Sequence, residues 1–164
     1  MSSKIDYRIP KASIEGKSED AVFWAVIAKA WPDAEEFDVT KKLQFATPGQ
    51  RAILATTLFI REVDNGGLEQ FFHNETGDIA QEVILGFERL GSPENAEIVR
   101  QALTFFGPGS AIASQSARRD SLQKTSRTEK DGFFEPLNQK LYGEPRLWPL
   151  FRRYLDQHPD EFFV

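Results

Sequence analysis

The sequence of 164 residues contains no cysteine, which excludes disulfide scaffolds, thiol catalysis and cysteine-based zinc sites. It contains only two histidines, His73 and His158, and neither accompanies a nucleophile-elbow pattern, so no serine–histidine–carboxylate triad can be assembled. The longest uninterrupted apolar run, residues 21–28, is far shorter than the roughly 20 residues that span a bilayer. No secretory signal is visible, so we expect a cytoplasmic protein with no membrane contact.

The excess of acidic over basic residues is small. There are 25 acidic and 20 basic residues, which gives a net charge of −5 and counts against direct binding of nucleic acid, since nucleic-acid-binding domains are usually basic. Hydrophobic residues make up 40% of the chain and phenylalanine alone occurs 14 times. This composition supports a packed interior, and the length suits one domain that buries roughly 70% of its unfolded surface.

Start signals for helices recur along the chain ahead of apolar residues at helical spacing. Ser18 can cap a first helix, and Thr47-Pro48-Gly49-Gln50 fits a capping box with proline in the first helical position. Asp78 can cap another helix, and Ser92-Pro93 opens a further one. We therefore predict an all-α fold: a compact single domain of about seven to nine helices.

Proline and glycine residues predict where the helices end and where the helical domain begins. Pro32 should stop the first helix, and Asn65-Gly66-Gly67 should end the second, with a short helical turn over 68–72 after it. At the amino terminus, Pro10 and Gly16 should break any helix, and the alternation of apolar and polar residues predicts an extended arm. We expect an arm over residues 1–16 and the helical domain over 17–164.

Residues 111–130 have little apolar content and a net charge of +3. This stretch predicts either a solvated helix or a mobile connector. Its Arg118-Arg119 pair could contact nucleic acid, but no aromatic residues alternate with these arginines. A solvated face is therefore the favoured interpretation of the pair.

Residues 61–97 concentrate negative charge. Nine acidic residues face two arginines there, a net charge of −7, which is more negative than the whole chain. Carboxylates on rigid helices create a lasting negative field that attracts basic proteins, although ordinary solubility is an alternative purpose. The candidate contacts for a basic partner are Glu62, Asp64, Glu69, Glu75, Asp78, Glu82 and Glu88.

Two other functions stay open at this stage. The loop from His73 to Asp78 holds His73, Glu75 and Asp78, which could approach a divalent cation in a metal-dependent enzyme. Metal sites need three or four converging ligands. We therefore favour a capped, solvated loop over a metal site for these residues. We assign no catalytic residue, metal or cofactor. Trp24, Trp31 and Trp148 could instead line a groove of a ligand-binding or toxin-neutralising module, or belong to the core.

The segment from Arg61 to Asn74 is the most distinctive part of the sequence. It resembles the signature of a small bacterial family of unknown biochemical function that is known through a DNA-mimic protein, and the resemblance covers about residues 45–163. The signature places are filled by Glu62, Asn65, Gly66, Gly67, Phe71, Phe72, Asn74 and Gly77. These signature residues are expected to have structural roles. The glycines should form a bend, the asparagines should cap nearby backbone groups by hydrogen bonds, and the phenylalanines should pack in the core.

This resemblance implies an all-helical fold without known catalysis. It also implies surface carboxylates that imitate DNA phosphates, roughly 6–7 Å apart along a strand, and occupy a DNA-binding transcription regulator. We therefore expect a non-enzymatic interaction protein whose partner is a basic protein. The hypothesis requires that the carboxylates of residues 61–97 lie in one strip and are not neutralised by neighbouring arginines and lysines.

Overall fold

The computed structural model describes residues 6–31, 39–108, 113–143 and 147–164, and regular structure in these ranges is helical apart from one isolated β-bridge. The predicted all-α fold is confirmed. No helix among the described residues is long and apolar enough to cross a membrane. The α-helices are α1 (Glu19–Ile27), α2 (Val39–Leu43), α3 (Pro48–His73), α4 (Ala80–Arg89), α5 (Pro93–Leu103), α6 (Gln115–Lys124), α7 (Arg127–Gly143) and α8 (Leu147–Gln157). Short 3-10 helices are η1 (Lys11–Ile14), η2 (Ala28–Ala30), η3 (Glu75–Ile79), η4 (Thr104–Phe106) and η5 (Pro159–Glu161).

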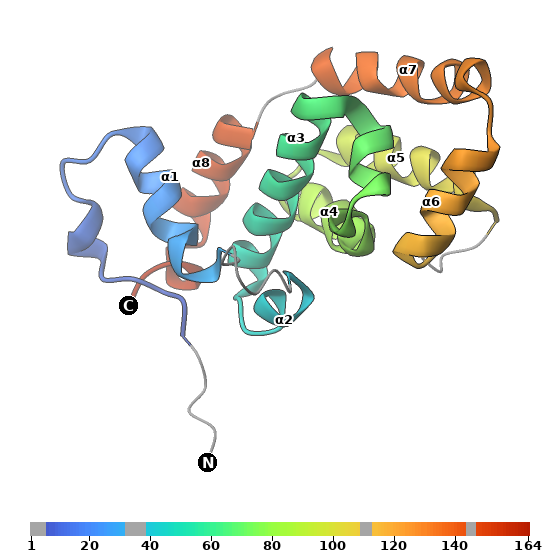
Figure 1. Cartoon of the computed structure of the whole chain (residues 1–164). Helices are drawn as coiled ribbons and strands as arrows, with labels where there is room; N and C mark the ends of the chain where they lie inside the picture. Colours follow the sequence, from blue (N-terminus) through green and yellow to red (C-terminus); the bar gives the residue numbers. More distant parts are fainter. Residues whose placement is uncertain (1–5, 32–38, 109–112, 144–146) are drawn as a thin grey trace.

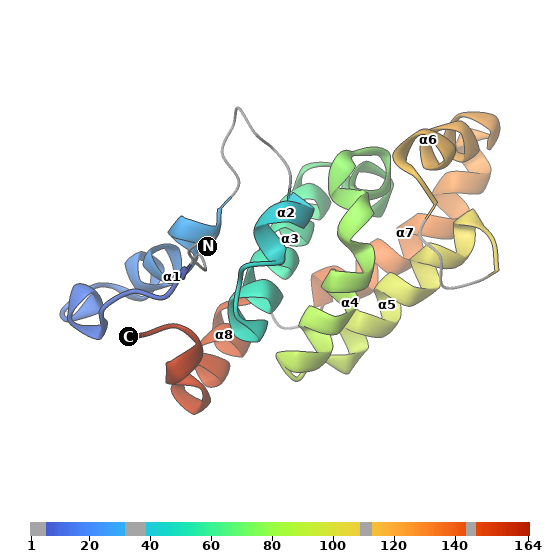
Figure 2. The same cartoon turned by 90° about the horizontal axis from the view of Figure 1, so that it is seen from below.

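Helix α3 runs through the middle of the molecule, with α1 and α8 on one side of it and α4 to α7 on the other (Figures 1 and 2). Two clusters of buried side chains follow this division. The larger cluster joins α3 to α4, α5 and α7, and its largest fully buried members are Phe59, Phe71, Phe72 and Phe87. The smaller joins α3 to α1, α8 and η5, and includes the fully buried Ile27, Ile53, Phe151 and Phe162.

The described part of the amino-terminal arm packs against the carboxyl-terminal end of the chain. Ile9 is buried and forms the parallel bridge with Phe163: its amide donates to the carbonyl of Phe162 at 3.0 Å, and its carbonyl accepts from the amide of Val164 at 3.1 Å. The expectation that Pro10 and Gly16 break any helix was wrong in one detail, because η1 lies between them. Its 3-10 turn is short enough to begin after Pro10 and end before Gly16.

The predicted helix starts are largely confirmed. Ser18 caps α1 by accepting from the amide of Ala21, and Thr47 and Gln50 form the full capping box of α3. Helix α1 ends at Ile27 and continues as η2. Pro32, which was predicted to stop it, lies outside the described residues.

Asp78 and Ser92, which were predicted to cap helices, do not accept a hydrogen bond from a first-turn amide of α4 or α5. Helix α4 begins at Ala80 without a side-chain cap, so the assignment of Asp78 as its cap was wrong; Asp78 lies in η3 and binds Arg118 instead. Ser92 precedes the first residue of α5 as expected. Its hydroxyl accepts from the side chain of Asn95 rather than from a backbone amide.

The Asn65-Gly66-Gly67 segment interrupts α3 with a bend, at the place where the sequence predicted the end of a helix. Gly66 and Gly67 leave the helical conformation, and Gly67 has φ +71° and ψ −171°, a region that side chains other than glycine rarely adopt. Helical backbone resumes after Gly67 and continues as far as His73, which confirms the short helical turn predicted over 68–72 and extends it by one residue. The amide of Leu68 at the restart donates to Oδ1 of Asn138 on α7 at 2.9 Å, so a distant helix caps the second half of α3.

We predict that Gly67→Ala destabilises the protein by at least about 1–2 kcal/mol, because alanine is strained at this φ and ψ. Its Cβ would also lie 2.7 Å from Nδ2 of Asn138. The matched control is Gly132→Ala on α7, where the added Cβ meets open space; it should be neutral or stabilising by roughly 0.4–1 kcal/mol. Urea unfolding followed by circular dichroism measures both, and equal stability of the two variants would contradict this account of the bend.

Candidate partner-binding surface

Glu62 holds the two halves of α3 together across the bend. Its Oε2 accepts from Nε2 of Gln70 at 2.8 Å and from Nδ2 of Asn74 at 2.9 Å, and its Oε1 accepts from Oγ1 of Thr76 at 3.0 Å. All three donors follow the bend, whereas Glu62 precedes it. This half-buried carboxylate is therefore used within the protein, although the sequence suggested that it contacts a partner.

The remaining signature residues also serve the architecture around the bend. Phe71 and Phe72 are fully buried and stack edge to face with their ring centroids 4.9 Å apart. Gly77 lies against Arg118, where a Cβ would be 2.7 Å from Nη2. The helix-terminal hydrogen bond expected from Asn65 comes from Asn138 instead, and Asn65 itself is exposed.

Arg118 is fully buried, so its assignment to a solvated face was wrong. Its guanidinium donates to the carbonyls of Phe72 at 2.8 Å and Asn74 at 3.0 Å, to the carbonyl of Ala113, and to Oδ1 of Asp78 at 2.7 Å. The planar guanidinium presents several donors in a fixed arrangement, which suits the cluster of carbonyls at the end of α3. Arg118 thereby joins α6 to the end of α3 and to η3.

Three of the carboxylates that the sequence suggested as partner contacts carry ion pairs, in addition to Glu62, which is held by neutral donors. The cations come from α5, α6 and α7, which lie outside or at the edge of the acidic stretch in the sequence. Such pairs cancel much of the field that an isolated carboxylate would project. The pairs join Glu69 to Arg127 and Lys130, Asp78 to Arg118, and Glu88 to Arg100.

The candidate carboxylates also line separate hollows. Glu62 and Glu75 line one, Asp64 and Glu69 line a second beside the bend, and Glu82 lines a third between α3 and α4. Beside the bend, the hydrogen bond from Arg127 lowers the pKa of the Asp131 carboxyl below its usual range, so the charge of Arg127 is shared between Asp131 and Glu69. The carboxylates of residues 61–97 therefore do not share one groove.

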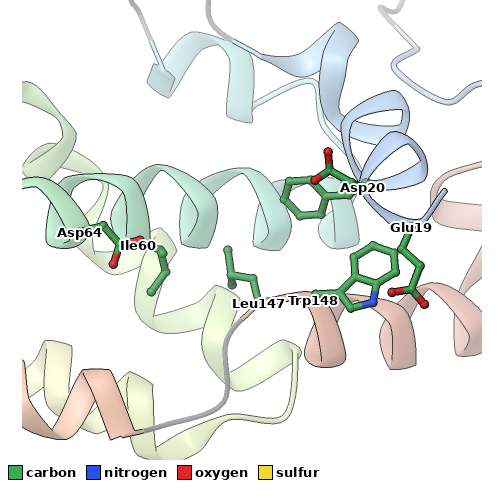
Figure 3. A pocket seen from close by; sticks show the side chains of 7 residues that line it. Glu19, Asp20, Ile60, Asp64, Leu147 and Trp148 are labelled. Carbon is green, nitrogen blue, oxygen red and sulfur yellow. The ribbon is translucent and has the colours of Figure 1, made fainter.

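A larger groove, of about 520 Å³, lies where α1, α3 and the start of α8 meet. Its walls are apolar and aromatic in the middle and carry carboxylates at the ends. Figure 3 shows Glu19 and Asp20 on α1 at one end, Ile60 and Asp64 on α3 at the other, and Leu147 and Trp148 of α8 between them. Phe23 of α1 completes the described lining.

The groove has a negative character. Its described lining residues include three carboxylates and no lysine or arginine. Glu19 and Asp20 are exposed in the first turn of α1, and the nearby Arg152 is engaged by Asp156 at 2.9 Å. The hydrogen bond that Arg152 donates to Asp156 is the main cause that raises the pKa of Arg152, and the charge of Glu19 adds a small effect.

One of the three tryptophans, Trp148, lines this groove, and none of the three is fully buried. Trp148 is half-buried on its wall, with its ring centroid 6.5 Å from that of Phe23. Trp24 is 40% exposed and packs edge-on against the half-buried Trp31, whose other neighbour is the guanidinium of Arg61 at 5.3 Å. An exposed apolar cleft beside the indoles is what the groove hypothesis required.

Sequence reasoning missed Glu19, Asp20 and Phe23 as groove residues. The helix dipole by itself accounts for the two acids, because it favours negative charge in a first turn, and the apolar face of α1 accounts for Phe23. Both explanations hold for α1 alone. The extra role exists only because α1 packs beside α3 and α8, so no local signal could have revealed it.

The loop proposed for a metal-dependent enzyme has other contacts. Asp78 binds Arg118, and the carbonyl of His73 accepts from Nε of Arg119 at 2.8 Å. Among the residues that the structure describes, no group of three or more histidine, aspartate or glutamate side chains is placed to hold a metal ion. The geometry therefore offers no observation in favour of that alternative.

These features define a small all-α protein with a bent central helix and an acid-ended apolar groove. A family model described as DMP19-like protein matches residues 44–158, which is more than half of the chain, so the chain belongs to the DMP19-like protein family. The match includes the bend of α3 and its signature residues, and it confirms the resemblance at the level of the family. No curated protein and no solved structure matches the chain.

We predict that Arg118→Met lowers the free energy of unfolding by about 3–5 kcal/mol, because the carbonyl of Phe72 loses the donor that Arg118 supplies, Asp78 loses its ion pair, and the carbonyl of Asn74 keeps only the amide of Gly77. The neighbouring Arg119→Met is the control. Its exposed side chain makes one hydrogen bond to a backbone carbonyl, so it should cost less than about 1 kcal/mol. Chemical denaturation compares the two, and an Arg118→Met protein as stable as the Arg119→Met protein would refute the anchoring role.

Proposed function

We propose that this chain is a non-enzymatic interaction module that binds a basic segment of another protein in the groove between α1, α3 and α8. The observation that carries the proposal is the arrangement of that groove: apolar and aromatic walls of Leu147, Trp148 and Phe23, with the carboxylates of Glu19 and Asp20 at one end and that of Asp64 at the other.

The chemistry of the groove specifies its occupant. A segment with an apolar side chain at its centre would bury that side chain against Trp148 and Leu147, and aromatic residues in a desolvated pocket are frequent anchors of binding energy. A lysine or arginine next to that centre would meet the exposed carboxylates of Glu19 and Asp20. Complementary charge of this kind speeds association and selects the partner.

A DNA-binding transcription regulator is the partner class that the DNA-mimic relative suggests. Such proteins carry basic segments, which a negative surface attracts. We keep this class of partner but propose that it binds mainly in the groove rather than at residues 61–97. In that stretch Glu69, Asp78 and Glu88 are paired with cations, and Glu62 forms hydrogen bonds at the bend. Asp64 belongs to both surfaces.

The test compares two variants that lose the same charge. Proteins retained from a lysate by the immobilised native chain are identified, purified and titrated against Glu19→Gln/Asp20→Asn and against the control Glu94→Gln/Glu97→Gln on α5. We expect the groove variant to bind about five- to tenfold more weakly and the control to bind like the native chain. Added salt should weaken native binding, because it screens exposed charges.

Retention of a protein is not in itself support. A partner whose affinity is the same for both double variants, or is indifferent to salt, would refute binding at the groove. Trp148 gives an independent readout: its indole N–H resonance, assigned with a Trp148→Phe variant, should shift on binding. An unshifted Trp148 resonance in the saturated complex would contradict the proposal.

A further inference from the structure

A small cleft between the first turns of α3 and the second half of α4 carries positive charge. Its volume is about 210 Å³, below the roughly 300–1,000 Å³ of pockets for drug-sized molecules, so it suits a single chemical group. The two helices touch at its base, where a Cβ on Gly86 would lie 3.0 Å from the carbonyl oxygen of Ala52. The lining residues are Pro48, Arg51 and Ala52 of α3, and Glu82, Leu85, Gly86 and Arg89 of α4.

Arg51 has an unused donor in this cleft. Its Nε is buried and finds no acceptor among the described residues, and none of its guanidinium nitrogens forms an ion pair with a described carboxylate. A buried donor without a partner is costly, and in native proteins it calls for an explanation. A bound oxyanion would supply the acceptor, and the guanidinium plane can bind two oxygens at once.

Hydrogen bonds outside the cleft fix the position of the Arg89 guanidinium. Its Nη1 donates to Oη of Tyr154 at 3.3 Å, and that hydroxyl donates to Oε1 of Glu161 at 2.8 Å. The hydrogen bond to Tyr154 is the main cause that raises the pKa of Arg89, and the charge of Glu161 adds to it. The other oxygen of Glu161 accepts from the amide of Gly49 at the start of α3, so the positioning of Arg89 is tied to α3 itself.

Glu82 restricts which anion fits. This half-buried carboxylate lines the same cleft, yet it forms no ion pair with Arg51 or Arg89. A ligand must therefore present acceptors to the two arginines and a donor to Glu82. A singly protonated phosphate group offers both, whereas sulfate and a carboxylate offer only acceptors at neutral pH.

We propose that the cleft binds a phosphate group, with its anionic oxygens on Arg51 and Arg89 and its hydroxyl donating to Glu82. Leu85 is 48% exposed on the same wall, where it can contact the carbon of a phosphate ester. This site is separate from the groove, shares none of its residues, and holds or fails independently of the proposed function.

The test is isothermal titration calorimetry of the native chain at pH 6.5, in a buffer without oxyanions, with inorganic phosphate, O-phosphoserine and sulfate. Both phosphate compounds should bind saturably and more tightly than sulfate. Arg51→Gln should weaken them by about tenfold or more, since a charge-assisted contact is lost. No described group accepts a hydrogen bond from the side chain of Arg51, so circular dichroism should show that Arg51→Gln folds. The matched control Arg100→Gln, outside the cleft, should leave binding unchanged.

A second variant tests the role assigned to Glu82. Glu82→Gln replaces an acceptor with a group that can also donate, so it should remove the preference for phosphate over sulfate. Tighter binding of O-phosphoserine would identify an ester as the source of the group, and tighter binding of inorganic phosphate would identify the free ion. The proposal is overturned if neither compound binds, if folded Arg51→Gln binds as the native chain does, or if sulfate equals phosphate in the native chain.

Discussion

The bend in α3 is the constraint on which the rest of this structure depends. Gly67 adopts a backbone conformation that other residues rarely reach, Glu62 ties the two halves together, and Asn138 caps the restart. The first half of α3 then supplies walls to both hollows. The second half turns Phe71 and Phe72 into the core and delivers the carbonyls that Arg118 binds.

Acidic side chains have two physical roles in this protein. Glu62, Glu69 and Asp78 hold elements together and have donors or cations within reach, so they offer little field to a partner. Glu19 and Asp20 lie at the mouth of an apolar groove without a cation in its described lining. The family match begins at residue 44, so this acidic end of the groove lies outside the matched region, whereas its Asp64 end lies within it.

The two hollows have opposite chemistry because different helices complete each of them. Helix α3 contributes to both, but α1 adds carboxylates to the groove, whereas α4 adds Arg89 to the small cleft. Arg89 is held by Tyr154, and Glu161 connects that hydroxyl to the start of α3. The carboxyl-terminal end of the chain thus supports the basic cleft, while it also covers Ile9 of the arm.

The sequence by itself determined the helical class, the capping box of Thr47 and Gln50, and the position of the bend, because these depend on contacts between near neighbours. It also determined which segment belongs to the DMP19-like family. Only the tertiary structure decided that Asn138 of a distant helix caps α3 after Gly67, that Arg118 is buried, and which carboxylates form ion pairs. Their partners lie dozens of residues away, as Arg118 does from Asp78, and electrostatic energy depends on distance in space rather than along the chain.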